Sequence, residues 1–600
     1  MGQNKNMAQQ EQAWGSRIGL ILAMAGSAVG VGNFIRFPVQ AVQNGGGAFI
    51  IPYIVSFILL GIPLVFIEWS TGKWGGQLGY HTPPTIIKSI CKNKLSAYIG
   101  SLSLFSSIVI CAYYCFIESW ILSYAIHSVI GTFSGMNEYE VSEFFNIYLD
   151  LNTSTLGIPG DTLISFFICI SINILVLCGG IHKGIENTAK ICMPLLLIFG
   201  IFLVIKAYTM KAGVDGASFD STLALNFLWT PDFDSLSNPK VWLSAAGQIF
   251  FTLSLGMGAL QTYASYMKKD DDIALSSLTS AFTNEIGEVV LGSAIIIPIS
   301  IGYFGIDKVV ELTQLGGLGL GFRTMPYLFQ QWGPILSAVA GFSFFCILFI
   351  ASITSSVSIG QPSVAFLSKN HNWSQKRSSL VYGVVLLVIA LPCVLFFNQG
   401  VFDQYDFWGG TVSLFLFAML EAILFSWIIG IDKGWKLITD NADIQLPKFF
   451  KFVLKYITPT MLIIIFLAAL VKPKDDDWSQ LSFKGWEVDG SSIIGELSHK
   501  NIGPNKTWFA DSFYAENEGI VKSITETEIY IDDKSYSLPD DATVLVSQED
   551  IVSVGTPLYE GKIVNNVFYI DVCRLGLLLF LIILCILSRI SIHRNFKTEI

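Results

Sequence analysis

Two stretches inside long apolar runs combine glycines with oxygen-bearing side chains, a composition that suits cation binding. The first is Gly26-Ser-Ala-Val-Gly-Val-Gly-Asn33 and the second is Thr252-Leu-Ser-Leu-Gly-Met-Gly258. Glycine costs roughly 1 kcal/mol per helical position relative to alanine, so each cluster favours local unwinding. Backbone carbonyls freed at a break can coordinate a small cation, and a half-helix N-terminus can face a carboxylate. The alternative is that the small residues only permit close helix packing.

The composition indicates a membrane protein. Of the 600 residues, 52% are hydrophobic and 14% are charged, whereas soluble proteins carry roughly a quarter charged residues. The net charge of −10 argues against a nucleic-acid partner, which needs a basic face. No His and Cys cluster has metal-ligand spacing, and the sequence shows no nucleophile and base constellation. We therefore expect a protein embedded in lipid that is not an enzyme.

Twelve hydrophobic runs are long enough to cross a bilayer, which takes about 20 apolar helical residues. They span residues 15–42, 48–72, 96–131, 161–181, 187–209, 240–267, 274–304, 334–368, 378–398, 404–431, 447–471 and 567–591. The expected fold is therefore an all-α, multi-pass membrane protein with twelve transmembrane helices. Residues 1–472 would form a core of eleven helices, and 567–600 the twelfth helix and a tail.

The charges of the short loops predict the orientation. Residues 73–95 carry four lysines and no acid, whereas residues 132–160 carry four acids and no basic residue. The first loop should be cytoplasmic and the second outside. Twelve spans then place both termini in the cytoplasm, and we expect a plasma membrane location, the inner membrane of a bacterium.

Residues 473–566 form an acidic insertion between the last two runs. They hold 18 acidic residues and 7 lysines, a charge of −11 that leaves +1 for the rest of the chain. The orientation places the insertion outside the cell. Short strands bounded by Gly, Asp and Pro are expected at Ile520-Val, Ile529-Tyr-Ile, Ala542-Thr-Val-Leu-Val and Val567-Phe-Tyr. We therefore predict a small extracytoplasmic β-rich domain.

Several motifs closely resemble the neurotransmitter:sodium symporter family, especially its bacterial leucine-transporter-type members. They are Trp14-Gly-Ser-Arg17, Ala25-Gly-Ser-Ala-Val-Gly-Val-Gly-Asn-Phe-Ile-Arg-Phe-Pro38, Asn44-Gly-Gly-Gly-Ala-Phe49, Tyr113-Tyr114, Ile117-Glu-Ser-Trp120, Gln248-Ile-Phe-Phe-Thr-Leu-Ser254, Asn284-Glu285, Thr354-Ser-Ser356 and Asp406-Phe-Trp408. The resemblance implies two inverted five-helix repeats, helices 1–5 and 6–10, with helices 1 and 6 broken. It also implies sodium-coupled amino-acid uptake by alternating access. A sensor that keeps this fold without net transport is the alternative.

The resemblance further implies two sodium sites built from oxygen ligands. The first would use Ala28, Asn33, Thr252 and Asn284, completed by the carboxylate of the substrate. The second would use Gly26, Val29, Ala351, Thr354 and Ser355. Since neutral ligands leave the first site short of negative charge, sodium and amino acid should strengthen each other's binding reciprocally.

The substrate pocket implied by the resemblance suits a zwitterion. Amine-carrying relatives have an Asp at the position of Gly30, and this chain has none. The carboxylate would meet Tyr114 and the amides near Val31 and Gly32, and the amino group Ala28, Phe251, Thr252 and Ser254. The side-chain pocket would be lined by Ser27, Val31, Ile110, Phe251, Met257, Ser355 and Ile359. Ser27 and Met257 depart from the leucine-transporter pattern, and the flexible Met favours bulky aliphatic and aromatic side chains.

Charged residues within the membrane need a partner or a task. Glu288 lies one turn from Asn284, at a position where chloride-dependent relatives have Ser. A carboxylate there predicts chloride independence and possible proton counter-transport, unless it is a permanently ionised structural group. Glu68 is expected to bind amide groups freed at the helix breaks. Arg36 and Asp406 match the outer gate of the family, and Trp14 and Tyr266 match the inner gate. Glu11 and Lys369 would form an ion pair at the inner gate with the two charges exchanged relative to the leucine-transporter pattern. The alternative is that both side chains are solvated.

Overall fold

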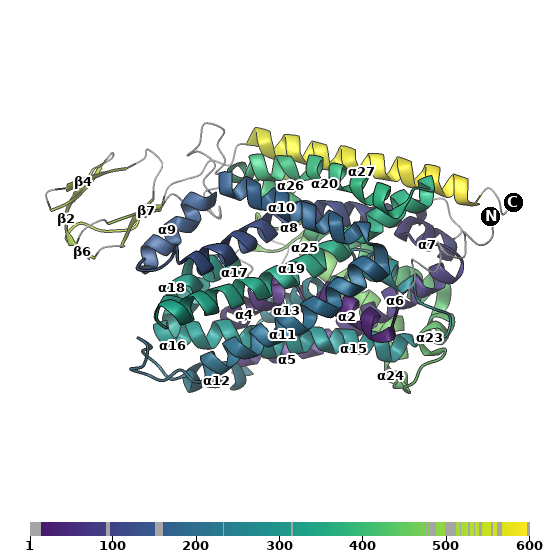
Figure 1. The fold of residues 1–600 in the computed structure, drawn as a ribbon, viewed down its shortest axis with the longest axis horizontal. Helices are drawn as coiled ribbons and strands as arrows, with labels where there is room; N and C mark the ends of the chain where they lie inside the picture. The colour runs from purple at the N-terminus through teal and green to yellow at the C-terminus, as the bar shows by residue number, and fades with distance from the viewer. Residues whose placement is uncertain are drawn as a thin grey trace.

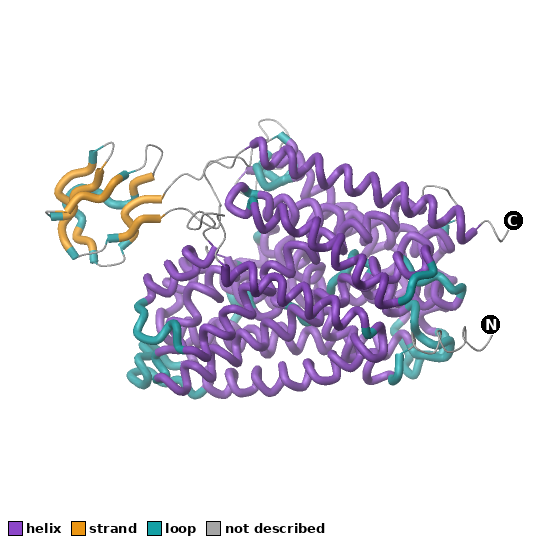
Figure 2. Tube along the Cα trace, turned by 45° about the horizontal axis from the view of Figure 1, so that its top comes forward, coloured by secondary structure: helices purple, strands orange, loops and turns teal. Residues whose placement is uncertain are grey.

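The computed structural model describes residues 14–91, 96–149, 160–231, 233–313, 316–474, 478, 488–498, 512–515, 518–525, 528–532, 534–538, 543–553, 556–560 and 567–596. These residues form a large body of helices and, apart from it, a small group of strands (Figures 1 and 2). The helices run roughly along one direction, as expected for a bundle that crosses a bilayer.

Every hydrophobic run of the sequence falls on described helices, and further short helices lie between the runs. In chain order the first half contains α2 (Arg17–Ala28), α3 (Val31–Phe34), α4 (Arg36–Gln43), α5 (Gly47–Ser56), η1 (Phe57–Gly61), α6 (Ile62–Gln77), α7 (Pro83–Ile90), α8 (Ser96–Ile130), α9 (Glu138–Leu149), α10 (Gly160–Cys178), η2 (Gly180–Glu186), α11 (Asn187–Tyr208) and α12 (Ser221–Trp229). The second half contains η3 (Phe233–Ser237), α13 (Pro239–Thr252), α14 (Ala259–Ala264), α15 (Ile273–Glu285), η4 (Ile286–Gly292), α16 (Ser293–Leu312), α17 (Gly316–Gly319), η6 (Leu320–Thr324), α18 (Met325–Gln330), α19 (Pro334–His371), α20 (Gln375–Leu395), η7 (Phe397–Gln399), α21 (Val401–Tyr405), η8 (Asp406–Ser413), α22 (Leu414–Ile423), η9 (Leu424–Gly430), α23 (Ile431–Thr439), α24 (Lys448–Phe452), η10 (Val453–Ile457), α25 (Thr458–Leu470), α26 (Ile493–Leu497) and α27 (Val567–Phe596).

Among the described residues, nine continuous helices are long and apolar enough to cross a membrane. Two shorter apolar helices, Arg17–Ala28 and Thr162–Cys178, fall in two further runs. The run at 240–267 is divided between α13 and α14. The multi-pass helical fold is thus confirmed, while the count of twelve spans and the repeat symmetry stay predictions.

The two glycine-rich stretches interrupt their helices. Val29 and Gly30 separate α2 from α3, and residues 253–258 separate α13 from α14. In the second break Ser254, Gly256 and Gly258 have φ angles of 53°, 77° and 68°. A Cβ on Gly256 would lie 2.3 Å from the carbonyl oxygen of Leu414. Only glycine fits there, so the sequence forces this turn.

The broken helices lie in the centre of the bundle. The long helices α8 and α19 pack against each other, α2 packs against α15 and α19, and α14 packs against α6. Figure 1 places α2 and α13 among the other helices of the body. This arrangement brings both breaks next to the middle of α8 and α19.

The strands form two antiparallel sheets near the C-terminal end of the chain. They are β1 (Ser512–Tyr514), β2 (Gly519–Ile524), β3 (Glu528–Ile531), β4 (Lys534–Ser537), β5 (Thr543–Val544), β6 (Ile551–Val552) and β7 (Pro557–Glu560). One sheet has the order β1-β7-β5 and the other β4-β3-β2-β6. Their inward side chains make a separate small core that includes Val521, Ile529, Ile531, Val552 and Leu558.

Three of the four expected strand segments fall at least partly in strands and one does not. Ile520-Val lies in β2, Ile529-Tyr-Ile lies in β3, and the segment that begins at Ala542 contains β5, although Ala542 itself lies outside the described residues. Val567-Phe-Tyr begins helix α27, so the prediction of a strand there was wrong. Short aromatic and β-branched runs suit either structure, and here the apolar stretch that follows extends the helix to 30 residues.

Candidate substrate and sodium sites

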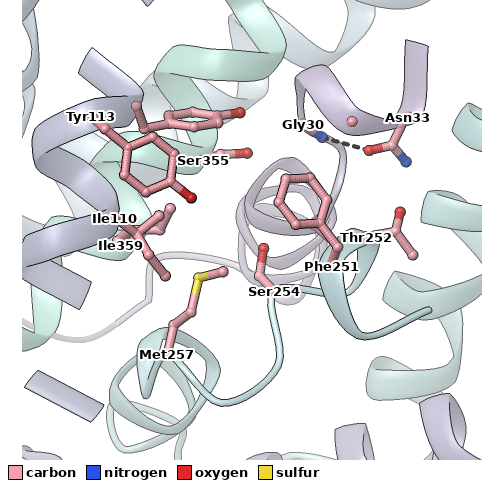
Figure 3. Close-up of a pocket in the computed structure, with 13 residues that line it drawn as sticks. Gly30, Asn33, Ile110, Tyr113, Phe251, Thr252, Ser254, Met257, Ser355 and Ile359 are labelled. Carbon is pink, nitrogen blue, oxygen red and sulfur yellow. Dashed lines mark hydrogen bonds between the residues drawn. The ribbon is translucent and has the colours of Figure 1, made fainter. Parts of the chain in front are cut away.

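A small pocket lies where both helix breaks face α8 and α19 (Figure 3). Its lining is Ala28, Gly30, Gly32, Asn33, Ile110, Tyr113, Tyr114, Phe251, Thr252, Ser254, Met257, Ser355 and Ile359. Ten of the twelve expected substrate residues line it. The free volume is about 30 Å³, room for roughly two water molecules. An amino acid can therefore enter only if the lining side chains move apart.

The two expected residues that do not line the pocket contribute backbone groups close to it. The Val31 amide donates to the Tyr114 hydroxyl at 3.2 Å. The Ser254 hydroxyl donates to the Ser27 carbonyl at 2.7 Å, which ties the two breaks together. The Ser27 hydroxyl is bonded to Ser358 instead of pointing into the pocket. Sequence reasoning did not assign Ser358 a role.

Gly30 sets the shape of one wall. A Cβ at this position would lie 3.1 Å from the Tyr114 hydroxyl and 3.2 Å from the Ser355 hydroxyl. Any side chain there would therefore enter the polar end of the pocket. Ile110, Met257 and Ile359 form the apolar end (Figure 3). The pocket thus has one end that suits the charged amino and carboxylate groups of an amino acid and one end that suits a hydrophobic side chain.

The four residues expected at the first sodium site lie together. The Asn33 Nδ2 donates to Asn284 Oδ1 at 2.8 Å, and Asn284 Nδ2 donates to Thr252 Oγ1 at 2.9 Å. Ala28, Asn33 and Thr252 also line the pocket. Asn33 Oδ1 accepts from the Gly30 amide at 2.8 Å (Figure 3). The cluster holds amide, hydroxyl and carbonyl oxygens, which suit a hard cation.

Glu288 closes this cluster with a fully buried carboxylate. It accepts hydrogen bonds from Thr252 Oγ1 and Gln248 Nε2, and from the Tyr53 hydroxyl at 2.8 Å. Glu288 thus lies beside Thr252, one of the residues expected at the first sodium site, and its role there stays a prediction. Sequence reasoning gave no role to the neighbouring Glu285, which accepts from Asn284 Nδ2 at 3.4 Å. The spacing of three residues between the two acids was the signal that could have indicated a carboxylate pair.

The oxygens expected at the second sodium site also converge. Ser355 Oγ lies 3.4 Å from the Gly26 carbonyl oxygen and 3.5 Å from that of Val29. Thr354 Oγ1 lies 3.2 Å from the Ala351 carbonyl oxygen. A Cβ on Gly26 would lie 3.2 Å from Thr354 Cβ, so glycine allows α2 to approach α19 this closely. The groups that could bind a cation at this site are again all oxygens.

The two side chains of the expected outer gate contact other groups and not each other. Arg36 and Asp406 are both exposed, and no direct ion pair joins them within the part of the chain that the structure describes. The Arg36 guanidinium lies 4.4 Å from the centre of the Phe251 ring. The Tyr113 hydroxyl donates to Asp406 Oδ1 at 2.7 Å, a role that sequence reasoning did not assign.

The expected inner gate is packed. Trp14 is 5% exposed and its Nε1 donates to the Tyr263 carbonyl at 3.0 Å. Tyr266 stacks on His81 with ring centres 4.6 Å apart. Burial, together with the positive charge of Lys369, lowers the pKa of His81 to about 3, so the ring is neutral near pH 7. Lys369 therefore lies near this gate, whereas its expected partner Glu11 lies outside the described residues.

The buried Glu68 binds one of the two breaks. Its Oε1 accepts from the Gly256 amide at 2.6 Å, which satisfies a backbone group freed between α13 and α14. No bond from the first break to Glu68 is found among the described residues. Glu421 accepts from Thr71 and Gln261, and Glu118 from Asn173 and Ser356.

Comparison with known proteins identifies the family. The model of the sodium:neurotransmitter symporter family matches residues 11–137 and 131–500. The chain belongs to this family. The symporters of this family are sodium-coupled transporters and not enzymes, which confirms the resemblance and the absence of an enzymatic role as interpreted from the sequence.

Relatives of this symporter include transporters from all three domains of life. It is 33% identical over 469 residues to an uncharacterised sodium-dependent transporter of Methanocaldococcus jannaschii, covering 77% of this chain and 91% of that one. It is 24% identical to the mouse sodium-dependent neutral amino acid transporter B(0)AT2, covering 77% and 73%. The crystal structure of MhsT in complex with L-phenylalanine matches with a TM-score of 0.65 and 29% identity, covering 76% and 99%. Haemophilus influenzae has a further sodium-dependent relative.

Proposed function

We propose that this symporter takes up neutral hydrophobic amino acids, aliphatic and aromatic, by alternating access driven by sodium. The observation that carries the proposal is the pocket beside Gly30, where the Tyr114 hydroxyl and the Val31 amide meet at 3.2 Å. A substrate carboxylate can replace that mutual bond and bind both groups. The apolar wall around Met257 then receives the side chain.

Three observations favour an amino acid with a large side chain over an amine. An amine needs an acidic partner in the pocket, and Gly30 supplies none. Met257 is unbranched and can adapt to side chains of different shape. MhsT, which shares the fold, was crystallised with L-phenylalanine. Hydrophobic amino acids therefore fit this pocket better than small or charged ones.

Two sodium ions would travel with the substrate. The Asn33, Thr252 and Asn284 cluster supports the first site, and the oxygens near Ser355 support the second. At the first site the substrate carboxylate would supply negative charge that neutral ligands lack. Glu288, behind Thr252, would supply the charge that chloride supplies in relatives with Ser there, so no chloride is required. Its protonation after sodium release would carry a proton outward.

Access to the pocket alternates between two gates in this proposal. Arg36 and Asp406 would close the outer gate, with Tyr114 and Phe251 beneath them, while Trp14 and Tyr266 would open the inner one. Exposure of the first pair and burial of the second supports entry from the Arg36 end.

We further propose that both termini are cytoplasmic in the inner membrane of a bacterium and that the β-rich insertion is outside. In Figure 1 the end of α27 and the strands lie at opposite ends of the helical body.

Uptake in proteoliposomes tests the proposed function. We expect an inward sodium gradient to drive accumulation of radiolabelled leucine, and potassium in place of sodium to abolish it. Unlabelled Leu, Met, Phe, Tyr and Trp should compete, whereas Gly, Asp and Lys should not. Competition by only small or charged amino acids would contradict the substrate class. Sodium-dependent binding without uptake would indicate a sensor.

Removing the Tyr114 hydroxyl should weaken substrate binding. We expect Tyr114→Phe to raise the leucine KM by about tenfold or more, because a hydrogen bond to a charged group contributes roughly 1.5–3 kcal/mol. Tyr124→Phe is the matched control on the same helix, since the Tyr124 hydroxyl has no hydrogen-bond partner among the described residues. Equal KM values for the two variants would contradict the role of Tyr114. Initial uptake rates over a leucine series provide the measurement.

A further inference from the structure

A short helix at the start of the insertion packs onto the elements that carry the outer gate. Pro473 pairs with Val488 in an isolated antiparallel bridge, which returns the chain to the end of α25. Helix α26 (Ile493–Leu497) follows, and its cap Ser492 accepts from the Gly495 amide at 2.8 Å. Figure 1 shows α26 beside α27, at the end of the body from which the strands project. The insertion therefore contacts the transporter through an ordered element.

Glu496 on α26 enters a buried polar cluster. It is 3% exposed, and its Oε1 accepts from Arg574 Nη2 at 2.5 Å and from Gln404 Nε2 at 2.7 Å. Arg574 lies on α27 and also donates from Nε to Gln404 Oε1 at 2.8 Å. A buried charge of this kind is retained only where its partners are well placed. The cluster thus joins the insertion, α27 and α21.

Gln404 links this cluster to the gate. Its Oε1 also accepts from Trp408 Nε1 at 3.2 Å, so the side chain of one residue contacts α26, α27 and η8. Asp406 lies two residues further on, where α21 continues directly into η8. Its carboxylate is in turn held by Tyr113 of α8. A displacement of Gln404 would therefore move the Asp406 carboxylate relative to Arg36.

We propose that Glu496 and Arg574 are positioning residues of the outer gate, through which the insertion holds the Asp406 segment in place for closure. They do not contact the substrate pocket, so they act through Gln404. The inference rests on the proposed function, because closure of the outer gate is a step of transport. It assigns the first part of the insertion a role in the transport cycle.

Uptake kinetics of two conservative variants test the inference. Glu496→Gln keeps the shape of the side chain and removes its charge. Arg574→Lys keeps the charge but replaces the planar fork, which donates from separate nitrogens to Gln404 and Glu496, with a single ammonium group. We expect each to lower the maximal uptake rate by about tenfold, the size expected on loss of a charge-assisted hydrogen bond. The leucine KM should change by less than about twofold, since the pocket is untouched.

Asp571→Asn is the matched control at the same arginine. Asp571 Oδ1 lies 3.9 Å from Arg574 Nη1 and its side chain is 53% exposed, so this pair is weak. Uptake by Asp571→Asn should equal that of the wild type. Loss of uptake in this control to the same extent would overturn the inference, because it would show that any charge change at Arg574 has the effect.

Hydrogen–deuterium exchange separates a failure of the inference from a failure of the proposed function. We expect faster exchange in Glu496→Gln confined to peptides that cover residues 401–413, with the peptides of α2 and α19 unchanged. This readout needs no transport, so it decides the inference even if the wild type shows no uptake. Unchanged exchange at 401–413, or faster exchange throughout the helices, would overturn it. If Arg574→Lys does not purify, the isosteric Glu496→Gln variant is sufficient.

Discussion

Replacing Asn33 with alanine is expected to raise the sodium concentration for half-maximal uptake by about 100-fold. Asn33 makes two buried bonds, from the Gly30 amide to Oδ1 and from Nδ2 to Asn284 Oδ1, both at 2.8 Å. In the proposed function its oxygen also binds the first sodium ion. Loss of buried partners costs roughly 1–3 kcal/mol each, and about 2.7 kcal/mol corresponds to 100-fold in affinity.

The Asn33→Ala substitution should also weaken the binding of the substrate. Since its carboxylate would complete the first sodium site, the coupling between the two ligands is reciprocal. We therefore expect the apparent leucine affinity of Asn33→Ala to fall at low sodium and to recover partly at high sodium. Equilibrium binding of labelled leucine over a sodium series in detergent provides the measurement, and it does not depend on turnover.

Asn44→Ala is the control for Asn33→Ala. Asn44 is also buried and caps the C-terminal end of α4, but its Nδ2 donates to the Gln40 carbonyl of that helix at 2.8 Å. Its replacement should change the yield of folded protein more than the sodium dependence. A folded Asn33→Ala protein with the sodium dependence of the wild type would exclude Asn33 from the sodium site.

Local chemistry explains which features could be predicted from the sequence. Glycines that cannot be replaced, such as Gly256, mark the helix breaks because backbone geometry depends on them directly. The position of Glu288 followed from one helical turn beyond Asn284. The strand predicted at Val567 failed because three residues do not distinguish a strand from the first turn of a long apolar helix.

Long-range pairings could not be predicted in this way. Glu496 and Gln404 are separated by 92 residues, and Gln404 and Arg574 by 170. No periodicity or motif relates such positions, and a lone acid in an acidic insertion is expected to be solvated. The bond between Ser27 and Ser358 could not be predicted for the same reason, although Ser27 lies in a quoted motif and Ser358 lies two residues beyond another.

Replacing Glu288 with serine is expected to make transport depend on chloride. Uptake by the wild type should be equal in sodium chloride and sodium gluconate. Uptake by Glu288→Ser should fall to background in gluconate, a loss of at least about tenfold, and recover in chloride. The reason is that Thr252, Gln248 and Tyr53 all donate to this buried carboxylate. Without it, the donors and the nearby sodium lack a negative partner, which a chloride ion in the vacated space can replace.

Glu285→Ser is the matched control, because it removes the neighbouring acid and leaves Glu288 in place. Glu285 is partly exposed, and its hydrogen bond from Asn284 Nδ2 is long, at 3.4 Å. This variant should remain independent of chloride. Identical uptake by Glu288→Ser in both salts would contradict the charge-substitution hypothesis. Loss of uptake in both salts would instead indicate that Glu288 is a permanently ionised structural carboxylate.

The same variant tests proton counter-transport. If Glu288 returns protonated, leucine uptake by wild-type protein should raise the pH inside vesicles that contain a trapped pH-sensitive dye. Glu288→Ser in chloride should take up leucine without that change, because serine does not titrate. Two carboxylates three residues apart on one helix can share one proton, since each negative charge disfavours ionisation of the other. A pH change that persists in Glu288→Ser but disappears in Glu285→Ser would therefore assign the proton to Glu285, the acid to which sequence reasoning assigned no role.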